Sequence, residues 1–195
     1  MSEREIRSRL EAFLRSRLGP SAAPRVDAVH RVSVGRSREN WLFDATWLDG
    51  GAEVSESLIV RRDPLGGLLE TDRAVEYAVL AALQATAVPA PAVRWLDGDG
   101  AELGRPSLVM VREPGECDYF VLNGEGPLGE RVSLARRLCA LLVAVHRADW
   151  VSAGLGDVFD DPGPDAATVE LAGWEAILRR DQLEPMWQPH VALRT

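Results

Sequence analysis

The sequence predicts an α+β fold: a five-stranded antiparallel sheet with one helix packed on it, preceded by a helix and followed by several more. Three observations predict this. Apolar residues recur at helical spacing near the N-terminus, short β-branched runs bounded by turn signals flank a second helical segment between residues 26 and 112, and helical spacing returns beyond residue 122. With 195 residues and 46% apolar composition, the chain is long enough to build a hydrophobic core.

The N-terminal part predicts a helix and then three strands. Ile6, Leu10 and Leu14 share one face of a helix over residues 3–18, and Gly19-Pro20 ends it. Alternating valines and apolar runs predict strands over residues 26–34, 41–48 and 57–61. Between the second and third of these, Asp49-Gly50-Gly51 is a hairpin signal.

The remaining elements follow from the same periodicities. A helix is predicted over 69–84, and Val88-Pro89-Ala90-Pro91 separates it from strands over 93–96 and 107–112. Further helices are predicted over 133–150, with Ser133 as N-cap, over 169–183, and from 191 onward. The Gly-, Asp- and Pro-rich residues 151–167 predict a long loop.

The charge of the chain restricts its partners. The net charge is −8, which argues against nucleic acid or an anionic membrane as the main partner. All 22 basic residues are arginine, so a site that needs a cation must use arginine. Cys117 and Cys139 are far apart and have no metal-ligand spacing, which predicts reduced thiols. The chain shows no signal peptide and no apolar run long enough to span a bilayer, so a cytoplasmic protein is expected.

Four segments carry a family resemblance. They are Val34-Gly-Arg-Ser-Arg-Glu-Asn-Trp-Leu-Phe, Leu58-Ile-Val-Arg-Arg-Asp-Pro, Val88-Pro-Ala-Pro and Leu103-Gly-Arg-Pro-Ser-Leu-Val-Met-Val-Arg-Glu-Pro-Gly-Glu. In order and spacing they resemble the aminoglycoside phosphotransferase and choline kinase-like family, above all its bacterial phosphotransferase-like members and the kinase-like module of some acyl-CoA dehydrogenases. The resemblance implies a protein-kinase-like N-lobe with an N-terminal helix and hinge over 1–115, and an incomplete helical C-lobe over 116–195.

The turn between the first two strands is the first candidate nucleotide contact. Kinases place a loop over the ATP phosphates at this point, and successive backbone N–H groups of such a turn converge on phosphate oxygens. The candidate residues are Gly35, Arg36, Ser37, Arg38, Glu39 and Asn40. A plain hairpin turn is the alternative, because the segment has one glycine where kinases have several.

Arg61 and Glu76 are predicted to form an ion pair at the phosphates. Kinases carry a lysine on the third strand that contacts the α- and β-phosphates and pairs with a glutamate of the next helix. Arg61 occupies that place, and the competing Arg62 points to the opposite face by strand alternation. Glu76 lies near the apolar side of its helix, where Arg61 is the natural partner; the alternatives are a solvated strand-end arginine and a surface glutamate.

The strand over 107–112 runs into Pro114-Gly115 and matches the hinge between kinase lobes. Backbone groups of the hinge bind the adenine edge in that family. The resemblance therefore implies adenine contacts at Met110, Val111 and Glu113. Without the other motifs, the segment is only a strand and a turn.

The catalytic loop of the family is not found in the sequence. That loop reads H-G-D with an asparagine five residues on, and supplies the base and a magnesium ligand. His146-Arg147-Ala148-Asp149 is similar in letters only, since it ends a predicted helix and Gly154 stands where asparagine is needed. We therefore assign no catalytic and no metal-binding residue, and expect the chain to stop before that loop.

Two functions are expected from the resemblance. The first is transfer of a phosphoryl group from ATP or GTP with Mg²⁺ to a small-molecule hydroxyl, for which this chain supplies nucleotide binding. The second is a non-catalytic module that binds nucleotide or a partner, either a second copy or a missing C-lobe, through the apolar face of residues 133–150. The acceptor is not readable from the sequence.

Overall fold

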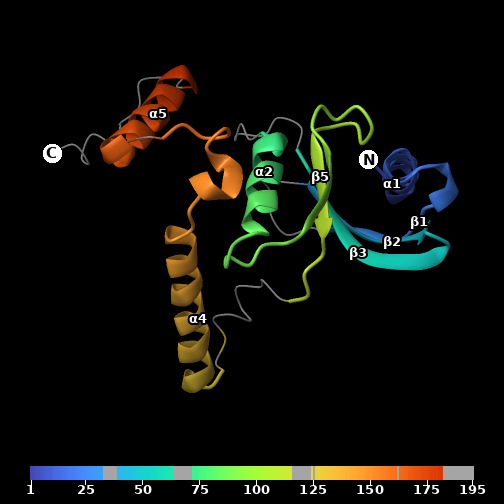
Figure 1. The fold of residues 1–195 in the computed structure, drawn as a ribbon, viewed down its shortest axis with the longest axis horizontal. Coiled ribbons are helices and arrows are strands. Elements are labelled where there is room, and N and C mark those ends of the chain that lie inside the picture. The colour runs from blue at the N-terminus through green and yellow to red at the C-terminus, as the bar shows by residue number, and fades with distance from the viewer. Residues whose placement is uncertain (33–38, 64–71, 116–123, 125, 162, 182–195) are drawn as a thin grey trace. The chain divides into compact units, whose positions relative to one another are not determined.

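The computed structural model describes residues 1–32, 39–63, 72–115, 124, 126–161 and 163–181 (Figure 1). By their contacts, the residues divide into two units, Met1–Val158 and Phe159–Thr195. The first unit contains the whole sheet. The lobe boundary expected between residues 115 and 116 remains a prediction.

The sheet has five antiparallel strands, as predicted, and their order is β1-β2-β3-β5-β4. The strands span Arg25–Val32, Glu39–Asp49, Ala52–Arg62, Val93–Asp97 and Ser107–Val111 for β1 to β5. β2 and β3 are longer than expected because they pair without interruption from Glu39↔Arg62 to Asp49↔Ala52. Gly50 and Gly51 have φ values of 57° and 87°, the left-handed conformation that a two-residue hairpin turn requires.

Helix α1 (Glu3–Leu18) has the predicted bounds and covers one face of the sheet. Ser2 begins it, since the Ser2 hydroxyl accepts a hydrogen bond from the Glu5 N–H at 3.2 Å. Gly19 ends it with φ 88°. The apolar stripe of α1 packs against alternate residues of β2 and β3 in a core formed by Ile6, Leu10, Phe13, Leu14, Trp41, Phe43, Ala45, Leu58 and Val60.

Helix α2 (Arg73–Leu83) lies on the opposite face of the sheet (Figure 1). Asp72 caps it through its carboxylate, which accepts the Ala74 N–H at 2.7 Å. The helix was predicted to start at residue 69, and residues 69–71 lie outside the described part of the chain. This placement brings the first turn of α2 to the end of β3.

Helix α4 (Leu128–His146) begins five residues before its predicted start and ends four before its predicted end. The prediction of Ser133 as N-cap is therefore wrong, because residues 128–132 are already helical. Pro127 is the N-cap, and it makes no side-chain hydrogen bond to the helix. No described residue of α4 is buried, and Cys139 lies exposed on it as a free thiol. Cys117 lies outside the described residues.

The segment predicted as a loop over 151–167 contains two short helical turns, η2 (Val151–Leu155) and η3 (Gly163–Asp165). Helix α5 (Ala166–Asp181) follows in the second unit, close to its predicted bounds. The helix predicted from residue 191 lies outside the described part. Within the described ranges, none of the helices combines the length and the apolar character needed to cross a membrane.

Phe43 is fully buried between α1 and the sheet, and Phe43→Ala is expected to lower the free energy of unfolding by about 3–5 kcal/mol through lost burial and an unfilled cavity. Urea denaturation measures this change. Leu48→Ala on the same strand is the control, since Leu48 is 45% exposed and its loss should cost less than about 0.5 kcal/mol. Equal losses in the two variants would contradict the assigned core.

Candidate functional site

Arg61 and Glu76 form the predicted ion pair across the junction of β3 and α2. Arg61 is the last residue but one of β3, and Glu76 lies in the first turn of α2, which Asp72 begins. The Arg61 Nη1 group donates to Glu76 Oε1. The two side chains are 35% and 22% exposed, so the guanidinium is fixed at one end and still reaches solvent.

A second arginine, which sequence reasoning missed, completes this ion pair. Arg73 Nη1 donates to the other carboxylate oxygen, Glu76 Oε2, and the Arg73 side chain is 0% exposed. Arg73 Nε also lies 3.0 Å from Asp63 Oδ1, at the residue that follows β3, without hydrogen-bond alignment. The available signal was the spacing, since residues three apart on a helix share a face.

Arg62 points to the opposite face, as strand alternation predicts. Its side chain is 3% exposed, and its Nη2 group donates to the Leu103 carbonyl oxygen at 2.8 Å. Burial lowers the pKa of Arg62, and the nearby Glu39 carboxylate acts in the opposite direction. Arg62 is thus part of the α1 side of the sheet.

Glu39 does not belong to the turn for which it was predicted. It begins β2 opposite Arg62, and its carboxylate lies on the α1 side, with Arg62 Nη1 at 3.5 Å and Arg105 Nη1 at 3.2 Å. The Trp41 indole N–H donates to it at 2.9 Å. Because β2 extends to Glu39, the strand's alternation turns this carboxylate away from Arg61.

Asn40 is the one member of the predicted turn that the structure places beside Arg61. It pairs with Arg61 across β2 and β3 and therefore shares its face. Among the described residues, neither the buried Asn40 Oδ1 nor the buried Arg61 Nε has a hydrogen-bond partner. Gly35, Arg36, Ser37 and Arg38 lie outside the described residues, so their role stays a prediction.

The hinge strand β5 leaves fewer free backbone groups than expected. The Val111 N–H donates to the Ala92 carbonyl at 2.8 Å, and the Arg112 N–H donates to Ser57 at 2.9 Å. Val111 therefore has no N–H free for an adenine edge. Glu113 is exposed, and in the described part its N–H is the first beyond β5 without a backbone acceptor. Met110 is 5% exposed and lies on the Arg61 face, next to Ile59.

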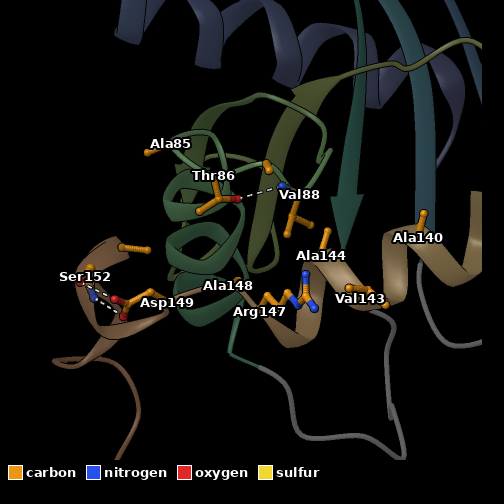
Figure 2. Close-up of a pocket in the computed structure, with 12 residues that line it drawn as sticks. Ala85, Thr86, Val88, Ala140, Val143, Ala144, Arg147, Ala148, Asp149 and Ser152 are labelled. Atoms are coloured by element: carbon orange, nitrogen blue, oxygen red, sulfur yellow. Dashed lines mark hydrogen bonds between the residues drawn. The ribbon is translucent and has the colours of Figure 1, made fainter.

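A separate cavity of about 540 Å³ lies between the turn after α2 and the end of α4 (Figure 2). Small residues such as Ala85, Ala144 and Ala148 line most of it. None of the predicted nucleotide contacts lines this cavity, so we do not place the nucleotide there.

Asp149 has a local structural role at the edge of this cavity. Its carboxylate accepts the Ser152 N–H at 3.0 Å and the Ser152 hydroxyl at 2.7 Å (Figure 2). These hydrogen bonds lower the pKa of Asp149. The Asp149 carboxylate therefore fixes the start of the η2 turn.

Two comparisons with known proteins find matches. A family model described as the phosphotransferase enzyme family matches residues 29–194. The fold is similar to the crystal structure of a candidate aminoglycoside phosphotransferase from Ralstonia eutropha JMP134, with a TM-score of 0.63 and 22% sequence identity. That match covers 91% of this chain and 48% of the other, so this chain spans about half the length of that structure. No match is found among curated proteins.

Glu39→Ala is expected to lower the free energy of unfolding by about 3–5 kcal/mol, because it leaves the buried Arg62 without its carboxylate partner. Urea denaturation is the measurement. The matched control is Arg31→Ala: Arg31 is 61% exposed and lies 3.9 Å from the same carboxylate, so its loss should cost less than about 0.5 kcal/mol. A small effect of Glu39→Ala, similar to the control, would refute the buried ion pair.

Proposed function

This chain belongs to the phosphotransferase enzyme family, and from that premise we propose that it binds ATP or GTP with Mg²⁺ for phosphoryl transfer to a small-molecule hydroxyl. The sheet with α2 is the kinase-like N-lobe fold of that family, as predicted. The observation that carries the proposal is the ion pair of Arg61 with Glu76, which fixes a cation at the place where the family binds phosphates.

The surroundings of Arg61 fit a nucleotide's phosphates. Its side chain is about one-third exposed, and within the described part of the chain only its Nη1 group donates to Glu76. A guanidinium binds phosphate through two parallel N–H groups, so an arginine with free donors suits this ligand. Asn40 lies opposite, and Arg36 and Arg38 precede it closely in the sequence. We propose that these three residues complete the phosphate contacts.

The adenine is proposed to bind at the hinge after β5. Glu113 would donate its backbone N–H, since those of Val111 and Arg112 are already bonded. Met110 lies on the same face as Arg61, but its side chain is only 5% exposed, so it would contact a purine ring with a small part of its surface. Of the adenine contacts expected at Met110, Val111 and Glu113, the Val111 N–H is thus left out, because it already donates to Ala92.

We propose that this chain binds and orients the nucleotide. When bound, the nucleotide supplies the γ-phosphoryl group. Arg61 would hold the preceding phosphates and neutralise their charge, and Glu76 would hold Arg61. The sequence has no His-Gly-Asp motif, and we assign neither the base nor a metal ligand to it.

Nucleotide binding without transfer is a second candidate function. Two observations favour it: the motif just named is not in the sequence, and α4 carries exposed apolar residues such as Leu138 (66%) and Leu142 (53%). Apolar surface of this kind favours association with a partner. Phosphate release and transfer to hydroxyl acceptors in the presence of Mg-ATP distinguish the two functions: transfer supports the enzyme, and binding without transfer supports the module.

Arg61→Ala is expected to weaken Mg-ATP binding roughly 10- to 100-fold, because charge-assisted hydrogen bonds contribute about 1.5–3 kcal/mol. Isothermal titration calorimetry measures the affinity. Thermal unfolding is a second measurement. At a nucleotide concentration of about 100 times the wild-type Kd, bound nucleotide should stabilise the wild type by about 2.7 kcal/mol and the variant much less.

Arg94→Ala is the matched control for this measurement. Arg94 pairs with Glu56 on the sheet through two hydrogen bonds of 2.8 Å, so its loss removes a similar ion pair away from Arg61. Binding should be unchanged in this variant. If the wild type and Arg61→Ala both fail to bind ATP and GTP, the proposed nucleotide site is wrong.

A further inference from the structure

We propose that Arg73 is a positioning residue for Glu76. Because Arg73 occupies one carboxylate oxygen of Glu76, Arg61 binds the other oxygen through a single hydrogen bond. The exposed N–H groups of Arg61 that remain are then available for phosphate. This inference rests on the nucleotide site proposed above and deepens it. The role given to Arg73 is indirect: it acts through Glu76 and touches no phosphate.

The burial of Arg73 is the first observation. Its side chain is 0% exposed and is among the largest fully buried side chains of the described residues, in the first turn of α2. Burial of a guanidinium is costly unless carboxylates compensate it. Among the described residues, Glu76 on α2 and Asp63 after β3 compensate it. The buried guanidinium of Arg73 therefore connects α2 to the end of β3.

The use of the two carboxylate oxygens is the second observation. Glu76 Oε1 accepts from Arg61 and Oε2 accepts from Arg73, so each guanidinium holds one oxygen. Without Arg73, both oxygens would be free to bind one arginine through two parallel hydrogen bonds, the geometry that a guanidinium and a carboxylate prefer. Arg61 would then be bound more completely by Glu76 and would have fewer N–H groups for an anion.

The anchoring of Asp63 is the third observation. The Asp63 N–H donates to the Pro106 carbonyl at 3.1 Å, and the Asp63 carbonyl accepts from Arg105 Nη1 at 3.2 Å. Asp63 is therefore fixed to the two residues that precede β5, and its carboxylate gives Arg73 a fixed position. The position of Glu76 thus depends on the sheet through Arg73 as well as through Arg61.

The test uses Arg73→Met, Arg73→Lys and Glu76→Ala in the full chain, with Arg94→Met as control. Arg73→Met is expected to weaken Mg-ATP binding about tenfold, and Arg73→Lys, which keeps a cation for one oxygen, should recover part of this loss. The double variant Arg73→Met/Glu76→Ala should bind within about twofold of Glu76→Ala alone, because Arg73 acts through Glu76. Arg94→Met should bind as the wild type does. Multiplicative losses in the double variant would overturn the proposal.

A nucleotide-free measurement separates this inference from the proposed function. The Nε–H resonance of Arg61 in a ¹H–¹⁵N spectrum, assigned by its loss in Arg61→Lys, reports the surroundings of the guanidinium whose Nη1 group donates to Glu76. It should shift in Arg73→Met and stay unchanged in Arg94→Met. If the wild type binds no nucleotide, the proposed function fails, while the resonance still decides whether Arg73 positions the pair. An unchanged resonance in a folded Arg73→Met or, if that variant does not fold, in Arg73→Lys would refute the role of Arg73.

Discussion

The site depends on one carboxylate, that of Glu76, which lies between two guanidiniums. Arg61 comes from β3 and Arg73 from α2 itself, so the carboxylate joins strand and helix. An isolated helix of 11 residues is marginal in water, and contacts with the sheet must define its position. The charges that hold α2 in place are therefore the same charges that fix the guanidinium of Arg61, for which we propose phosphate binding.

The two faces of the sheet give two neighbouring arginines different surroundings. Arg61 and Arg62 have the same chemistry and the same sequence surroundings, yet one is half-buried beside α2 and the other is enclosed under α1. The α1 side satisfies Arg62 with Glu39 and the Leu103 carbonyl oxygen. Since the chain contains no lysine, this division by strand face separates the arginine for which we propose phosphate binding from the one that is buried in the fold.

The sequence predicted the parts of the fold that local patterns determine. Ser2 and Gly19 are the chemical signals that begin and end α1, and its bounds were predicted correctly. The pairing of Arg61 with Glu76 followed from strand alternation, helix faces and a family resemblance. The first half of β3 was missed because Glu53, Ser55 and Glu56 are polar and show no apolar alternation; their strand conformation comes from pairing with β2. Some contacts were not predictable because they join segments that are distant in the sequence. They are the ion pairs of Glu39 and Arg73 and the hydrogen bond of the Val111 N–H.

The continuous β2–β3 pairing also restricts how the length of this hairpin can vary during evolution. Deletion of one residue between the Gly50-Gly51 turn and Arg61 would turn Arg62 toward α2 and Arg61 toward α1, since side chains alternate along a strand. The sequence would still read as arginine followed by arginine, but the two would have exchanged environments. Insertions and deletions in this strand are therefore tolerable only in pairs, and an alignment of relatives that shows an odd gap here indicates a compensating bulge or a lost site.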